Sequence, residues 1–142
     1  MPEGHVTHRI ARDLGRTLKG SPVQATSPQG RFAEGAALLD GQQLTRAEAW
    51  GKYLFLDFGH GRIVHVHLGL FGRFTAGEGE PPAPLGAIRM RWVAATGWSD
   101  LRGPTACDLV GPHGREAIVA RLGPDPLRAD ADPERAKARI LG

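Results

Sequence analysis

The sequence predicts a mainly β domain of about eight strands, a β-sandwich or barrel, with an N-terminal helix and a second helix near the C-terminal end. Three observations lead to this prediction. Residues 23–110 consist of short segments rich in β-branched and aromatic residues, separated by glycine-containing turns. Helical periodicity precedes and follows this region. The 142 residues suffice for one domain with its own hydrophobic core.

The first helix is expected over residues 3–19. Its apolar residues recur at four-residue spacing and form one stripe, which consists of Val6, Ile10, Leu14 and Leu18. Pro2 suits the first helical position, and Glu3 suits the positive end of the helix dipole. Gly20-Ser21-Pro22 ends the helix.

The strands are expected in the segments that follow this helix. The clearest are residues 47–50, 53–58, 63–68 and 88–93. In the last of these, Arg89 and Arg91 alternate with Met90 and Trp92, which indicates a strand with one solvated face. Residues 75–84, rich in glycine and proline, are expected to form a mobile loop.

The second helix is expected over residues 112–122, with Ile118, Val119 and Leu122 facing inward. Gly123-Pro124-Asp125-Pro126 breaks this pattern. We therefore expect the folded domain to comprise residues 1–122 and residues 123–142 to form a linker.

The charge is mildly basic, with a net charge of +3 and 15 arginines against 3 lysines. Residues 1–75 carry the excess, with 9 Lys and Arg against 6 Asp and Glu. This balance is compatible with a phosphate-backbone partner, although a solvated surface explains the charge equally well. No apolar stretch is long enough for a membrane span, and the N-terminal residues are not expected to form a secretory signal. The single cysteine, Cys107, favours a reducing, cytoplasmic setting.

Pro2 and Glu3 are the first candidates for chemistry. Removal of the initiator methionine would leave Pro2 with a free secondary amine, which could attack an aldehyde. Glu3 could then serve as general acid or base. The alternative is structural, because proline and glutamate are ordinary helix-start residues.

Lys52 stands between Gly51 and an apolar strand and would lie on the same strand face as Leu54 and Leu56. A lysine at the head of a buried strand favours an anionic partner, either a carboxylate or a phosphate. A lysine that only extends from a strand end to solvent is the alternative.

Residues 65–72, His-Val-His-Leu-Gly-Leu-Phe-Gly, form the third candidate. His65 and His67 share a strand face, so a metal site is conceivable, although the sequence offers no third ligand. Leu70 and Phe71 stand between glycines, which predicts a sharp turn with an apolar tip. That tip could belong to the core or act as a wedge in a base stack. Residues 100–104 are expected to form another tight turn, which carries Arg102.

Four segments together resemble one family, the formamidopyrimidine-DNA glycosylase and endonuclease VIII enzymes. They are the opening Met-Pro-Glu-Gly, Trp-Gly-Lys-Tyr-Leu-Phe at 50–55, His-Leu-Gly-Leu-Phe-Gly at 67–72 and Leu-Gly-Pro-Asp-Pro-Leu at 122–127. The opening and the Asp-Leu-Arg-Gly-Pro turn at 100–104 are most similar to the actinobacterial endonuclease VIII type.

The resemblance implies a bifunctional DNA glycosylase and AP lyase that acts on oxidised bases, more so on pyrimidines. Pro2 would be the Schiff-base nucleophile that attacks C1′, and Glu3 the acid that protonates the sugar ring oxygen. Lys52 would bind a phosphate beside the lesion, and His67 would make a second phosphate contact. Leu70 would fill the space left by the flipped base. Arg102 joins the residues expected to bind DNA.

The same resemblance implies further properties. The partner would be damaged double-stranded DNA, bound by a monomer. No cofactor is expected in this chain, whereas a zinc finger would follow in a later region, beyond a helix–two-turn–helix region. Val6 stands where a second glutamate is frequent, and Leu70 replaces a methionine. Gly103 and Pro104 replace an Arg-Phe pair, which leaves recognition of the opposite base open.

Three alternatives remain from the sequence. The first is a glycosylase for oxidised purines. The second is a catalytically inactive DNA-binding domain of the same fold. The third is an unrelated basic β-barrel module that binds RNA.

Overall fold

The computed structural model describes residues 4–122, and within them the expected eight strands and the two flanking helices are present. The helices are α1 (Gly4–Leu18), α2 (Ala33–Leu39) and α3 (Pro112–Leu122). The strands are β1 (Gln24–Thr26), β2 (Arg46–Trp50), β3 (Tyr53–Asp57), β4 (Ile63–His67), β5 (Arg73–Gly77), β6 (Ile88–Ala94), β7 (Gly97–Arg102) and β8 (Ala106–Val110). The predicted fold class is therefore confirmed.

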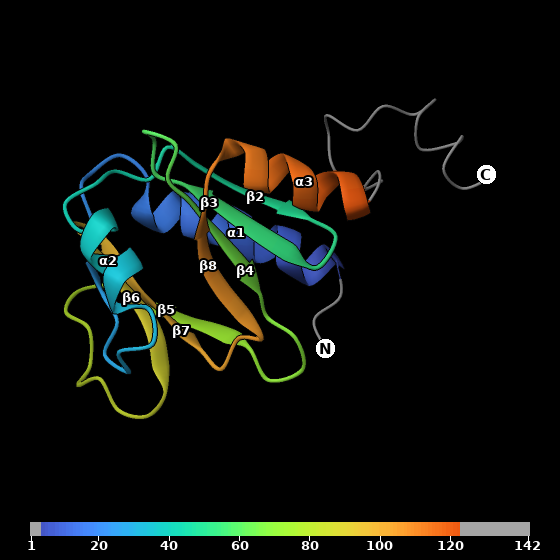
Figure 1. Ribbon diagram of the computed structural model, residues 1–142. Coiled ribbons are helices and arrows are strands. Elements are labelled where there is room, and N and C mark those ends of the chain that lie inside the picture. The colour runs from blue at the N-terminus through green and yellow to red at the C-terminus, as the bar shows by residue number, and fades with distance from the viewer. Residues whose placement is uncertain (1–3, 123–142) are drawn as a thin grey trace.

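The strands form two antiparallel sheets, one in the order β1-β6-β7-β5 and the other in the order β2-β3-β4-β8 (Figure 1). The inward residues of both sheets belong to one hydrophobic core. In the second sheet, Leu54 and Leu56 face this core while Tyr53 and Phe55 lie on the outer face, as strand alternation requires. The architecture is a sandwich, since no pair of described strands joins the two sheets by a ladder.

Helix α1 packs against strands of both sheets and contributes to the same core. Among its described side chains, the buried ones are Thr7, Ala11, Leu14 and Leu18. Val6 and Ile10, which the four-residue stripe placed inward, are only partly buried. The buried positions alternate between four- and three-residue spacing, which keeps one face of a 3.6-residue helix toward the core.

Two further expectations are corrected by the structure. Thr75 to Gly77 are not loop residues but belong to β5, where they pair with Asp100, Ser99 and Trp98 of β7. Arg91 is not solvated: it is 8% exposed, and its guanidinium forms a bidentate pair with Asp100 on the neighbouring strand. In both cases the structure of the segment depends on pairing with β7, which the local sequence pattern does not show.

Helix α3 lies on the outer side of the sheet β2-β3-β4-β8 and contacts β4 and β8 (Figure 1). Arg115 anchors it, through a 2.6 Å hydrogen bond from Nε to the Glu48 carboxylate and a position 5.4 Å above the Phe55 ring. Ile118 and Val119 are partly buried, but Leu122 is 38% exposed, so the expectation that it faces inward is wrong. The helix has no continuous apolar stripe that would bury one face.

No helix among residues 4–122 has the length and apolar character needed to cross a membrane.

Candidate nucleic-acid interface

Three turns meet at one end of the sandwich. They are the β2–β3 turn at Gly51 and Lys52, the β4–β5 turn at residues 68–72 and the β7–β8 turn at residues 103–105. Strand register brings them together, because Tyr53 pairs with His67 and the Thr105 backbone N–H donates a 2.8 Å hydrogen bond to the His67 carbonyl. The structure therefore brings Lys52, His67 and the β7–β8 turn to the same edge.

Lys52 occupies a two-residue hairpin turn between the paired residues Trp50 and Tyr53. Gly51 has φ of +59°, a conformation that glycine adopts without steric cost. Lys52 is exposed and belongs to the turn, so the strand alternation inferred from the sequence does not apply to it. The turn therefore places the Lys52 side chain at the surface of this end of the domain.

Leu70 and Phe71 form an exposed apolar tip on the β4–β5 turn, with exposed fractions of 65% and 80%. The turn is closed by a 2.9 Å hydrogen bond from the Gly72 N–H to the Leu68 carbonyl. A side chain at position 72 would collide with the backbone of Leu68, so only glycine fits there. The alternative in which this tip belongs to the core is wrong.

His67 is half-buried at the end of β4, and its ring stacks on Tyr53 with a centroid separation of 4.6 Å. His65 lies two residues earlier on the same face and is buried. Burial lowers the pKa of His65, and this effect outweighs the opposing effect of Asp108, whose Oδ2 lies 3.8 Å from Nδ1. Residues 4–122 hold no cluster of three His, Cys, Asp or Glu side chains fit for a metal, so the two histidines lack a third ligand.

Arg102 ends β7 beside the apolar tip. The expectation of a tight turn over residues 100–104 is therefore wrong for Asp100 to Arg102, which are strand residues paired with β5, and the turn begins at Gly103. The Arg102 Nη1 donates a 2.6 Å hydrogen bond to the Leu85 carbonyl, and its cross-strand partner is the exposed Arg73. Gly103 follows with φ of +57° and packs against the backbone of Phe71. Arg102 therefore links the loop before β6 to the end of the domain that carries the tip.

Sequence reasoning missed Tyr53 and Arg73. Neither could be found from the sequence alone, because each is placed opposite a selected residue only by the strand register, Tyr53 opposite His67 and Arg73 opposite Arg102. Pro2 and Glu3 lie outside the described residues, as does the expected linker 123–142.

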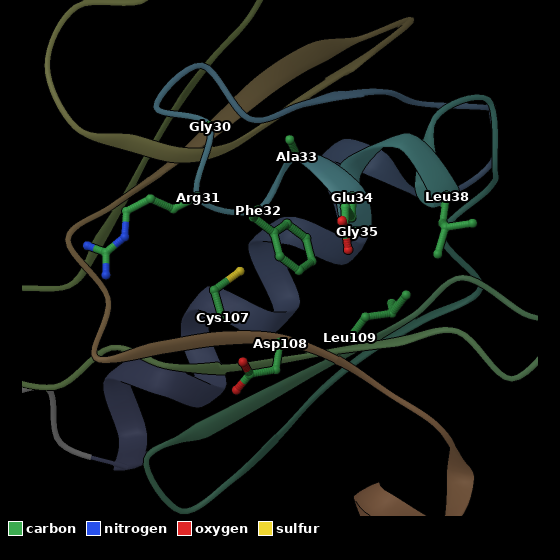
Figure 2. Close-up of a pocket in the computed structure, with 10 residues that line it drawn as sticks. All are labelled: Gly30, Arg31, Phe32, Ala33, Glu34, Gly35, Leu38, Cys107, Asp108 and Leu109. Atoms are coloured by element: carbon green, nitrogen blue, oxygen red, sulfur yellow. The ribbon is translucent and has the colours of Figure 1, made fainter.

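A separate groove of about 650 Å³ lies between α2 and β8 (Figure 2). The Cys107 side chain lies on its wall near the Phe32 ring, with Asp108 and Arg31 at its margin. Burial raises the pKa of Cys107 to about 12, which keeps the thiol protonated and unreactive. Lys52, His67, Leu70 and Arg102 are not among the residues that line this groove.

Comparison with known proteins identifies the family. Residues 1–106 match the family model of the formamidopyrimidine-DNA glycosylase N-terminal domain. The chain therefore belongs to the formamidopyrimidine-DNA glycosylase family, as its sequence motifs indicated.

Two curated relatives carry endonuclease 8 names. Endonuclease 8 1 of Mycobacterium tuberculosis strain H37Rv is 52% identical over 144 residues, which cover 99% of this chain and 54% of the relative. Endonuclease 8 of Salmonella typhi is 33% identical over 151 residues, which cover 99% and 55%. The chain thus spans about half the length of the curated relatives it matches.

Solved structures share the fold. MutM in complex with DNA containing carbocyclic 8-oxo-G matches with a TM-score of 0.76 at 16% identity, over 99% of this chain and 57% of that chain. Lactococcus lactis Fpg (MutM) in complex with DNA containing N7-benzyl-Fapy-dG matches with a TM-score of 0.77 at 17% identity, over 99% and 55%.

Proposed function

We propose that this chain is the nucleophile-bearing domain of a base-excision-repair DNA glycosylase and AP lyase that removes oxidised bases, chiefly pyrimidines, from double-stranded DNA. The observation that carries the proposal is the gathering of Lys52, His67 and the exposed Leu70–Phe71 tip at one end of the sandwich. A cation, an imidazole and an apolar wedge match the phosphates and the base stack of a duplex. The endonuclease 8 names of the 52% and 33% identical relatives favour the pyrimidine branch.

In the proposed reaction, Pro2 acts as the nucleophile after Met1 is removed. Glu3 protonates the sugar ring oxygen as the Pro2 nitrogen bonds to C1′ of the damaged nucleotide, which opens the ring. The base then departs with the proton of the Pro2 amine, which breaks the glycosidic bond and leaves an iminium. The iminium acidifies the adjacent carbon, so the 3′ phosphate is eliminated first and the 5′ phosphate second. Hydrolysis of the iminium then frees Pro2.

Lys52 and His67 would hold the phosphates that flank the damaged nucleotide. Lys52 supplies a compact positive charge, and His67 supplies a ring N–H. Both lie beside the tip that would enter the duplex, so the backbone is held where the base is displaced. Arg102, next to the same tip, would add a contact on the second strand.

Leu70 and Phe71 would occupy the space left by the flipped base. Large apolar side chains with exposed fractions of 65% and 80% leave much of their surface in water when DNA is absent. Insertion between bases would cover that surface, and stacking of a base on an aromatic ring contributes about 1–3 kcal/mol. This gain offsets part of the cost of extruding the damaged nucleotide.

We further propose that residues 123–142 lead to a second DNA-binding region. The curated relatives are about twice as long as this chain, so their second halves would supply the opposite wall of the DNA cleft. Zinc, where required, would be held in that region and not by residues 4–122. The protein would act as a monomer on DNA in the cytoplasm.

An excision assay tests the proposal. Duplexes containing thymine glycol or 8-oxoguanine are incubated with the mature chain alone, and with the chain followed by the second half of the Mycobacterium tuberculosis relative. We expect thymine glycol to be removed faster, at least by the longer protein. Glu3→Gln should slow base removal more than nicking of a preformed abasic site, where no glycosidic bond has to break. If neither folded protein excised any base, the chain would be an inactive DNA-binding domain.

A further inference from the structure

Tyr53 stacks with two histidine rings on the outer face of the sheet β2-β3-β4-β8. Its ring centroid lies 4.6 Å from that of His67 with an interplanar angle of 24°, and 5.2 Å from that of His65 with an angle of 15°. Tyr53 is the direct cross-strand partner of His67 and the diagonal neighbour of His65. These separations and near-parallel planes are those of offset stacking.

The stack restrains the orientation of the His67 ring. The His67 carbonyl is fixed by the 2.8 Å hydrogen bond from Thr105, which sets the backbone but leaves the side-chain torsions free. Among residues 4–122, Tyr53 is the aromatic residue on which the His67 ring stacks. Stacking on Tyr53 restrains the plane of the His67 imidazole. Because its nitrogen atoms form hydrogen bonds in that plane, their hydrogen-bonding directions are restrained as well.

His65 forms the rigid support behind Tyr53. It is 8% exposed and also packs 5.4 Å from Phe55, over which the Arg115 guanidinium lies. The Asp108 carboxylate is the acidic group beside it, at 3.8 Å. Its Nε2 has no hydrogen-bond partner among the described residues, so the contacts with Tyr53, Phe55 and Asp108 determine where this ring lies.

We propose that Tyr53 is a positioning residue, whose ring, supported by His65, holds the His67 imidazole in the orientation that contacts a DNA phosphodiester. This inference rests on the proposed function, in which His67 binds a phosphate. The phenol hydroxyl has no part in it. The aromatic face alone restrains the imidazole, so another flat ring at position 53 preserves the effect.

A double-mutant cycle tests the inference. Affinity of the chain for a fluorescein-labelled duplex with a tetrahydrofuran abasic-site analogue is measured at low salt by anisotropy. Tyr53→Phe keeps the ring and is expected to bind within about twofold of the wild type. Tyr53→Ile lacks the ring but suits a strand, and is expected to bind about 3- to 10-fold more weakly. In the His67→Ala background, the same Tyr53→Ile change is expected to alter affinity by less than about twofold.

A second readout observes the stack without DNA. The His67 ring protons are expected to show ring-current shifts in the wild type and in Tyr53→Phe that are lost in Tyr53→Ile. His65→Ala removes the ring that supports Tyr53, while the Tyr53 and His67 side chains themselves are unchanged. It should weaken DNA binding in the same direction, and it decides the matter if Tyr53→Ile does not fold.

The outcomes separate this inference from the proposed function. If His67→Ala binds DNA as well as the wild type, the phosphate role of His67 fails, and the positioning role fails with it. If His67→Ala weakens binding but Tyr53→Ile does not, only the positioning role is overturned. Equal losses from Tyr53→Ile with and without His67 would also overturn it, because the effect would then be structural.

Discussion

Gly69 lies directly against Thr105, so that a Cβ at position 69 would collide with the threonine Oγ1. Gly69 also has φ of +66°, in the left-handed region. The turn that carries Leu70 and the turn after Arg102 therefore fit together only with glycine at this position. Because the Thr105 N–H binds the carbonyl of His67, the contact also connects the apolar tip to the expected phosphate ligand.

Gly69→Ala is expected to destabilise the domain more than an alanine at another left-handed glycine. Gly79 is the matched control, with φ of +74° and no atom within 4 Å of its added Cβ. The left-handed backbone should cost about 1–2 kcal/mol at either position. The collision with Thr105 should add about 1–3 kcal/mol at Gly69 alone. Urea denaturation measures both, and equal losses would contradict the interlocked turns.

Leu70→Ala is expected to reduce excision from duplex DNA while changing the free energy of unfolding by less than about 0.5 kcal/mol. The side chain is 65% exposed, so its loss leaves no cavity. Leu54→Ala is the control within the core, at 0% exposure, and should lose about 2–5 kcal/mol. A loss of that size for Leu70 would show that the tip is packed and not a wedge.

Asp100→Ala is expected to destabilise the protein by about 3–5 kcal/mol, because it leaves the Arg91 guanidinium buried without its partner. The pair is bidentate, at 2.7 and 2.9 Å, and both side chains are nearly inaccessible. Asp13→Ala breaks an exposed pair with Arg16 of similar length, 2.8 Å, and should cost less than about 1 kcal/mol. Similar melting temperatures for the two variants would contradict this account.

Stability is expected to fall as pH drops below about 6.5, the ordinary pKa of histidine. Burial lowers the pKa of His65 in the folded state, so the unfolded chain binds the proton more readily. The stability that neutral His65 contributes is fully present above pH 6.5 and is lost as the pH falls toward the lower pKa of the folded state. His65→Phe should flatten the change in urea midpoint between about pH 7.5 and 5. The control His113→Gln, at an exposed position of α3, should leave this change in urea midpoint as it is in the wild type. If the wild type and His65→Phe show the same change with pH, His65 is not its cause.

The local pattern predicted the features that depend on neighbouring residues. Glycines on either side of Leu70 and Phe71 indicated the projecting tip, and segments rich in β-branched and aromatic residues indicated β2, β3, β4 and β6. Helix α2 escaped prediction because seven residues give too little periodicity. The burial of Arg91 was missed because its partner, Asp100, is found only through the register of β6 and β7. The stack on Tyr53 was missed for the same reason, since it depends on the pairing of β3 with β4.

Borohydride trapping on DNA with an abasic site tests the central proposal most directly. While Met1 is present, the Pro2 nitrogen is a tertiary amide without a usable lone pair, so only the mature protein can form the iminium that borohydride reduces. We predict a covalent adduct that peptide mapping assigns to Pro2, and no adduct when an added residue blocks removal of Met1. An adduct formed in full yield by the protein that retains Met1, or one mapped to Lys52, would contradict the assignment of Pro2 as the nucleophile.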